Sequence, residues 1–197
     1  MRTRRAALLG MALALALAAA PHAWAGEPAD QLFARIDQVL RILDDPALKP
    51  AARAEERRAA IGRVAHDIFD FEEIARRSLG RHWQARTQQE REEFVRLFGD
   101  LLERSYLGKI ELYSGERITL VGDALDGDLA TVRTRIVTKQ GSEIPVDYRL
   151  QRRGARWRAY DVAIEGVSLV ANYRSQFDKI IRRTSFQQLV QQVRDKQ

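Results

Sequence analysis

The sequence of 197 residues contains no cysteine and only three histidines. Without cysteine, the chain has no disulfide-stapled scaffold, no zinc site with thiolate ligands and no cysteine nucleophile. His66 and His82 are sixteen residues apart and lack the short spacing of a helical metal site. No phosphate-binding glycine loop, dinucleotide fingerprint or serine nucleophile elbow occurs either. We therefore predict a protein that is not an enzyme and that binds no cofactor and no metal.

The chain also lacks any long hydrophobic run after residue 25. The one such run, residues 6–20, follows a start with three arginines and precedes small residues up to Ala25. This order is that of a secretory signal peptide. The 15 apolar residues of the run are fewer than the roughly 20 that a membrane-spanning helix needs. We predict cleavage after Ala25, with residues 1–25 as signal peptide and residues 26–197 as one exported domain.

A strong excess of one charge is missing from this exported domain. The whole chain has 33 Lys and Arg against 27 Asp and Glu, a formal net charge of +6. Three of the arginines belong to the signal peptide, so the net charge of the remainder falls to +3. The basic character therefore does not indicate nucleic acid, and no nucleic-acid partner is expected for an exported protein. A cysteine-free exported chain must be stabilised by packing alone, which fits the Gram-negative periplasm.

Apolar residues of the N-terminal half recur at helical spacing and predict four helices. The first helix ends before Pro46, and the second covers residues 51–68. The third runs from a cap at Asp70 to Gly80, and the fourth runs from a cap at Thr87 to about Gly108. Two more helices are predicted after residue 168, the second with a cap at Ser185.

Between these helical regions the apolar period changes from 3.6 to 2. Four alternating segments, separated by turns at Asp126-Gly127, Gln140-Gly141 and Arg153-Gly154, predict an antiparallel meander with one apolar face. The predicted fold class is α+β, with a helical subdomain packed on a twisted four-stranded antiparallel sheet. Such a sheet can leave a cone-like cavity at its mouth, although periodicity does not distinguish an open cone from a filled core.

Large apolar side chains occupy the expected inner faces of these elements. Any one of them also fits an ordinary hydrophobic core. Together they form the predicted lining of the cone: Phe69, Ile74, Leu79, Trp83, Phe94, Phe98, Leu101, Tyr106, Val132, Ile136, Ile144, Val146, Tyr148, Leu150, Tyr173 and Phe177.

Several local strings resemble one family of exported proteins. They are FDFEEIARRSLGRHW at 69–83, EFVRLF at 93–98, LERSY at 102–106, IPVDY at 144–148 and GVSLVANYRSQF at 166–177, with Trp157 and Tyr160-Asp161-Val162 between the last two. The set is similar to the MlaC-type periplasmic phospholipid-binding proteins, also called the toluene-tolerance family. The likeness covers about residues 30–195, and its specificity comes from many strings in one order.

The resemblance implies a soluble periplasmic lipid-transport protein whose cone holds phospholipid acyl chains, with the head group at the mouth. The sixteen residues above are then the predicted lipid-binding residues. The resemblance also implies that the carrier shuttles lipid between an outer-membrane lipoprotein–porin complex and an inner-membrane ABC transporter with MCE domains. This exchange would maintain the lipid asymmetry of the outer membrane. We expect the carrier to be a monomer.

Three alternatives stay open at this point. The same family includes HpnM-like members associated with hopanoid gene clusters, so the cargo of this chain is either a phospholipid or a hopanoid-related lipid. An enzyme on the same cone-like fold would need a titratable group in the pocket, and Asp147, Asp161 and His82 are the candidates. Asp147 and Asp161 alternate out of phase with the apolar face, which counts against them. An adaptor protein with a filled core is the third alternative.

Overall fold

The structure is a computed structural model and describes residues 26–196; the predicted signal peptide lies outside these residues. The helices are α1 (Glu27–Asp44), α2 (Ala54–Ile68), α3 (Phe71–Leu79), α4 (Gln88–Ile110), α5 (Leu169–Arg183) and α6 (Phe186–Arg194), with short 3-10 turns at Ala51–Arg53 and Gly80–His82. The strands are β1 (Arg117–Asp126), β2 (Leu129–Val137), β3 (Glu143–Arg153), β4 (Arg156–Ile164) and β5 (Val167–Ser168). The predicted α+β class is confirmed.

The strands form one antiparallel sheet in the order β1-β2-β3-β4-β5. The four predicted strands are present, but the sheet has five strands rather than four. The additional strand arises because Glu165 and Gly166 both adopt positive φ angles, 51° and 80°, and reverse the chain directly after β4. Val167 and Ser168 then pair with the end of β4 before α5 begins. A strand of two residues is too short to show an alternating pattern in the sequence.

The predicted capping residues begin their helices as expected. The Asp70 side chain accepts a hydrogen bond from the backbone of Glu73, and Ser185 accepts one from Gln188. Thr87 and Glu90 form a reciprocal capping box at the start of α4. These caps satisfy backbone N–H groups that have no partner within the helix.

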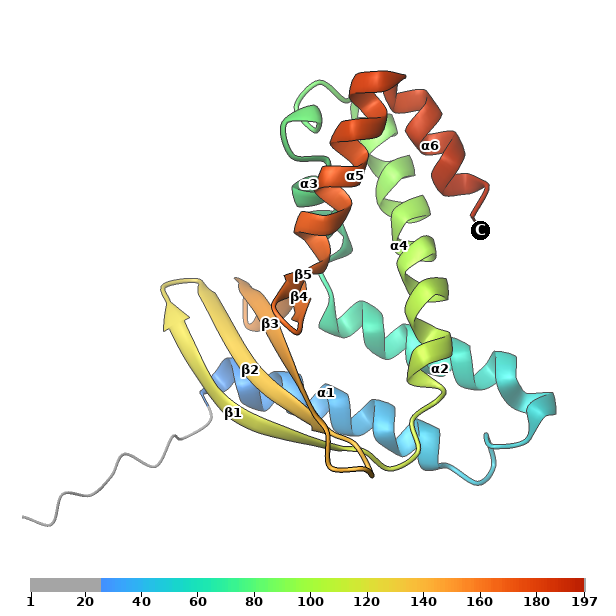
Figure 1. The fold of residues 1–197 in the computed structure, drawn as a ribbon, viewed down its shortest axis with the longest axis vertical. Coiled ribbons are helices and arrows are strands. Elements are labelled where there is room, and N and C mark those ends of the chain that lie inside the picture. The colour runs from blue at the N-terminus through green and yellow to red at the C-terminus, as the bar shows by residue number, and fades with distance from the viewer. Residues whose placement is uncertain (1–25, 197) are drawn as a thin grey trace, which may run out of the picture.

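The helices occupy two places relative to the sheet (Figure 1). Helix α1 lies along one face of the sheet, where it contacts β1, β2 and β4, and α2 packs beside it. Helices α3, α4, α5 and α6 form an upright bundle that meets the sheet through contacts of α3 and α5 with β4. Within residues 26–196, no helix combines the length and the apolar character needed to cross a bilayer.

Two irregularities in strand register change which side chains face α1. One lies between Leu120 and Gly122 in β1, and the other lies between Arg149 and Leu150, opposite β4. The second places Trp157 and Ala159 on the α1 side, where both are buried. Strict alternation along β4 predicts Trp157 and Ala159 on one face of the sheet and Val162 on the other, and the bulge instead places all three on the same face.

Candidate functional site

The buried apolar side chains form two clusters rather than one continuous core. The first, the helical cluster, is built from α3, α4, α5 and α6 and the turn that follows α3. The second, the sheet cluster, lies between α1 and the inner face of the sheet, which is the face that α1 covers. The two clusters and the half-buried apolar residues beside them offer apolar surroundings to a ligand.

Most of the helical candidates for lipid binding belong to the helical cluster. Its buried members include Ile74, Leu79, Trp83, Phe94, Phe98, Leu101 and Phe177, and Tyr106 and Tyr173 pack against it. The rings are in close mutual contact: the Phe98 centroid lies 4.9 Å from that of Tyr173, 5.1 Å from that of Phe177 and 5.6 Å from that of Phe94. These distances are those of ordinary aromatic packing. The helical residues thus pack tightly against one another.

The sheet candidates are placed differently. Val132 and Leu150 are buried in the sheet cluster, Tyr148 packs at its border, and Phe69 borders both clusters. Three sheet candidates belong to neither cluster: Ile136, Ile144 and Val146. Register places Ile136 between its cross-strand partners Ile118 and Ile144. Thirteen of the sixteen candidates are therefore brought together in two groups, with Phe69 at the junction, and the other three lie on the sheet outside both groups.

A set of half-buried apolar residues borders the sheet cluster. Its members are Phe33, Leu40, Ile68, Phe69, Ile118, Leu120 and Tyr148. Burial raises the pKa of Tyr148 to about 12, although its side chain keeps some accessible surface. Among residues 26–196, no hydrogen bond reaches the Tyr148 hydroxyl. We call these seven residues the apolar band. Of these seven residues, only Phe69 and Tyr148 are among the predicted lipid-binding residues, because the sequence pattern of α1 does not reveal which surface its apolar stripe covers.

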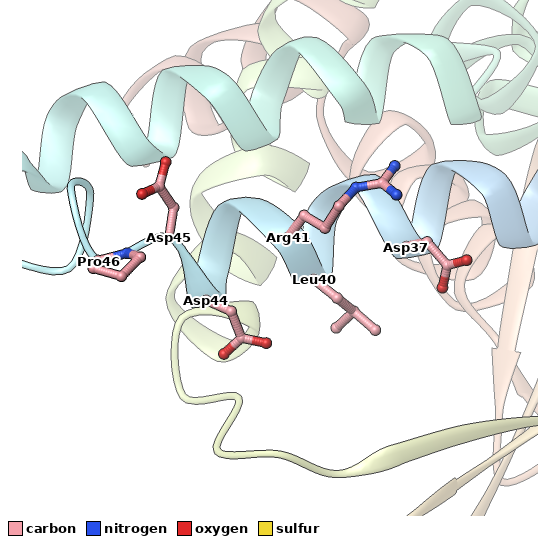
Figure 2. Close-up of a pocket in the computed structure, with 6 residues that line it drawn as sticks. All are labelled: Asp37, Leu40, Arg41, Asp44, Asp45 and Pro46. Carbon is pink, nitrogen blue, oxygen red and sulfur yellow. The ribbon is translucent and has the colours of Figure 1, made fainter.

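A hollow opens at each end of α1. The one at its C-terminal end is about 560 Å³ and is lined by Asp37, Leu40, Arg41, Asp44, Asp45 and Pro46. In Figure 2, Leu40 and Asp44 point toward the segment that leads into β1, and Arg41 points toward α2. The second hollow is about 330 Å³ and is lined by Gln31, Leu32, Ala34, Arg35, Asp67, Ile68, Leu150, Ala155, Arg156 and Trp157. Of the sixteen candidates, only Leu150 lines either hollow.

The second hollow has an apolar floor and a polar rim. The indole N–H of Trp157 is buried and has no acceptor in the described part of the chain. At the rim, Arg35 and Arg156 lie 3.8 Å and 3.7 Å from the carboxylate oxygens of Asp67. Such long, exposed ion pairs are weak, so both guanidinium groups stay available to another anion.

Two buried carboxylates join the bundle to the sheet. Asp70 accepts hydrogen bonds from Arg153 at 2.8 Å and Gln151 at 2.9 Å, and Glu73 accepts from Arg76 and Arg77 at 2.5 and 2.6 Å. Burial by itself raises the pKa of both carboxyls, but these hydrogen bonds and the arginine charges outweigh it and hold each pKa below its usual range.

Acid is expected to weaken the fold through Asp70 and Glu73. A carboxyl with a lowered folded-state pKa stabilises the fold above its unfolded-state pKa, near 4, and that stabilisation is lost as pH falls through the folded-state pKa. We expect the urea concentration at the unfolding midpoint to decrease as the pH is lowered below about 4. We expect Glu73→Gln to reduce this pH dependence, because an amide does not titrate. Circular dichroism during urea unfolding at several pH values measures it. Glu72→Gln, on an exposed neighbour, is the control; equal acid sensitivity in all three proteins would contradict the assignment.

The buried Asp161 holds helix α5 to strand β4. Its oxygens accept hydrogen bonds from Arg149 at 2.9 Å, from the Ser168 hydroxyl at 2.6 Å and from the Val170 backbone at 3.0 Å. The last two donors lie at the start of α5, so the carboxylate supports that helix. Its hydrogen-bonding capacity is used by the fold, and the burial of this charge has a structural reason.

His82, which is also a candidate for an enzymatic role, contacts Asp178 of α5. Its Nε2 atom lies 2.8 Å from the Asp178 carboxylate, which also accepts a hydrogen bond from Arg81 at 2.6 Å. The contacts of Arg81 and His82 with Asp178 hold the short 3-10 turn η2 (Gly80–His82) on the bundle. His82 and Asp161 therefore each have a role in attaching α5 to its neighbours.

Comparison with known proteins gives concordant matches. The intermembrane phospholipid transport system binding protein MlaC of Haemophilus influenzae is 24% identical over 135 residues, which is 64% of this chain and 63% of that protein. The toluene tolerance protein ttg2D of Pseudomonas putida is 24% identical over 126 residues, which is 63% of this chain and 59% of that protein. Each match thus spans less than two thirds of the relative's own length.

A solved structure shares the fold. The phospholipid-binding protein of Ralstonia solanacearum, determined in complex with a phospholipid, matches with a TM-score of 0.77 and 23% identity, over 87% of this chain and 97% of that chain. The family model for the MlaC protein matches residues 34–195, which include all elements from within α1 to the end of α6. The chain belongs to the MlaC family.

Proposed function

We propose that this protein is a soluble periplasmic phospholipid carrier that holds acyl chains between α1 and the inner face of the sheet. The apolar band is the observation that carries the proposal. Seven large apolar side chains are left half-buried beside a cluster that the fold otherwise closes. An apolar surface of this kind that is not covered by the protein itself favours a ligand or partner. The tightly packed helical cluster supports this surface rather than lining it.

Tyr148 supports the same placement. The phenol is shielded enough to raise its pKa to about 12, yet it keeps accessible surface and its hydroxyl has no partner among residues 26–196. Buried tyrosine hydroxyls usually find a hydrogen-bond partner. A tyrosine that is shielded but unpaired therefore suits a position beside a ligand.

The charges of the two hollows indicate where the head group lies. Three carboxylates line the C-terminal hollow, which disfavours a phosphate. Arg35 and Arg156 lie at the second hollow on either side of one carboxylate, Asp67, and each guanidinium group can interact with phosphate oxygens. We place the phosphodiester at the second hollow and the acyl chains along the apolar band.

The energetics of such a carrier require direct exchange with a partner. Burying a methylene stabilises by about 0.8 kcal/mol, so two acyl chains with about 30 methylenes oppose release into water by roughly 24 kcal/mol. Spontaneous escape over a barrier of that size takes on the order of a day. Partners that offer an apolar site remove this barrier. The outer-membrane lipoprotein–porin complex and the inner-membrane MCE-domain ABC transporter are the proposed partners, and outer-membrane lipid asymmetry is the proposed outcome.

Native mass spectrometry of the protein purified from the periplasm, followed by lipid extraction, tests the carrier function. We expect a mass excess that resolves into one phospholipid per monomer. Exchanging Arg35 and Arg156 for glutamine is expected to lower the bound fraction several-fold, because the phosphate loses two charge-assisted contacts. Asp44→Asn at the other hollow is the matched control and should keep the bound fraction unchanged.

The same experiment separates the alternatives. A hopanoid-related mass would identify the other branch of the family as the functional one. A bare mass that stays unchanged after incubation with phospholipid vesicles would exclude the carrier and favour an adaptor with a filled core. Turnover of the extracted lipid by the purified protein would favour the enzyme.

A further inference from the structure

A carboxylate lies on the apolar side of the sheet, in edge strand β1. The cross-strand partner of Asp123 is Val132, which is fully buried in the sheet cluster, and the partner of Leu125 is Ala130, which is buried there as well. Side chains of directly opposed residues share one face of a sheet. Asp123 therefore lies on the face that α1 covers, where apolar residues prevail. A half-buried charge in such a place needs a partner.

The bulge in β1 is what turns Asp123 to this face. The register against β2 shifts between Leu120 and Gly122. With strict alternation from Leu120, Gly122 and Ala124 would face inward and Asp123 would face outward. One extra residue in the strand exchanges these positions. The irregularity thus brings a single carboxylate to the beginning of α1.

The start of α1 meets this carboxylate directly. The backbone nitrogen of Gly26 donates a hydrogen bond to Asp123 Oδ2 at 2.9 Å. Gly26 is also the N-cap of α1, and its carbonyl accepts the first helical hydrogen bond, from the Asp30 nitrogen. A Cβ atom at position 26 would collide with the same carboxylate oxygen. Glycine is therefore the residue that allows this close approach.

Asp123 has no positively charged partner in the described part of the chain. Among residues 26–196, no Lys, Arg or His side chain pairs with it, and the Gly26 nitrogen is its one hydrogen-bond donor. Hydrolysis of the Ala25–Gly26 peptide bond by water leaves a carboxylate on Ala25 and an ammonium group on Gly26. We infer that Asp123 is the binding site for this new N-terminus, so that signal-peptide removal creates an ion pair between the Gly26 α-ammonium and the Asp123 carboxylate.

This ion pair fixes α1 over the sheet once the signal peptide is gone. An α-amino group has a pKa near 8 and is charged at neutral pH. A positive charge at a helix N-terminus opposes the helix dipole, and the adjacent carboxylate offsets that repulsion. Helix α1 covers the sheet cluster, so the pair stabilises the part of the fold that the proposed carrier function uses. The inference rests on the predicted cleavage site and is independent of lipid binding.

A double-mutant cycle with two N-termini tests the pair. Protein that begins at Gly26, released by a protease that leaves an N-terminal glycine, is compared with protein that retains Trp24 and Ala25, each as wild type and as Asp123→Asn. We expect the Tm of the lipid-free protein to be about 2–4 °C higher for the Gly26 start. This difference should disappear in Asp123→Asn. Asp126→Asn makes the same charge change on an exposed residue of β1 and should preserve it.

Any one of three results overturns the ion pair. Equal Tm values for the two N-termini, or a difference that persists in Asp123→Asn, would make Asp123 an acceptor for a backbone amide and nothing more. N-terminal mass analysis of the exported protein that finds a start other than Gly26 would also refute the proposal. None of these results depends on the lipid content, which native mass spectrometry measures separately.

Discussion

Replacement of Phe98 by alanine is expected to lower the free energy of unfolding by about 3–5 kcal/mol. Phe98 is 1% exposed, and its ring contacts those of Phe94, Tyr173 and Phe177 from α4 and α5. Removal of the ring leaves a cavity between two helices, and neighbours held in close packing refill such a cavity only in part. Urea unfolding of the lipid-free protein, followed by circular dichroism, measures the loss.

The exposed Leu112 provides the control for this experiment. It follows α4 and is 76% exposed, so Leu112→Ala is expected to change the free energy of unfolding by less than about 0.5 kcal/mol. The Phe98→Ala protein that remains folded should still carry lipid, because the proposed site lies on the sheet side. A loss of stability as small as that of the control, together with loss of lipid, would place the ligand inside the helical cluster instead.

Much of the architecture follows from local sequence signals. Asp70, Thr87 and Ser185 each stand at the start of a helix with the side-chain cap that their spacing predicts. The three predicted turns separate the four long strands of the sheet. These signals are local, because a cap or a tight turn depends on residues within a few positions of one another.

The facing of side chains in the sheet was harder to predict. An alternating pattern gives the right face only while the strand pairing is regular. The bulges near Val121 and opposite Leu150 reverse the facing of Asp123, Trp157 and Ala159, and they depend on pairing between strands. A single sequence shows the alternation but not the place where pairing inserts an extra residue.

The candidate site was predictable in part for a related reason. Helical periodicity identifies buried faces, so it found Phe94, Phe98 and Phe177, but it does not say what each face packs against. The structure packs those three rings against each other and turns the stripe of α1, with Leu32 and Ile36, toward the sheet. The partition into two clusters is a property of tertiary packing. The resemblance to a family suggested the carrier function that we propose, and the apolar band is the basis for the site that we propose for it.

Replacement of Ile136 by glutamate is expected to reduce lipid retention more than tenfold. Ile136 is half-buried on the inner face, beside Ile118 and Ile144, and belongs to neither closed cluster. A carboxylate at this position can stay hydrated in the lipid-free protein, but acyl chains would bury it without a partner. A penalty above about 1.4 kcal/mol reduces affinity more than tenfold. Native mass spectrometry of the purified variant gives the lipid-bound fraction.

Thr119→Glu supplies the matched control, because it adds the same charge to the neighbouring strand on the opposite, exposed face. We expect this variant to keep its lipid, and we expect both variants to be exported in similar amounts and to unfold within a few degrees of the parent protein. Normal lipid content in Ile136→Glu would show that acyl chains do not lie against this face. Equal loss of lipid in both variants would mean that added charge acts through the fold, and a fall in export that parallels the fall in lipid would make Ile136 part of the folding core.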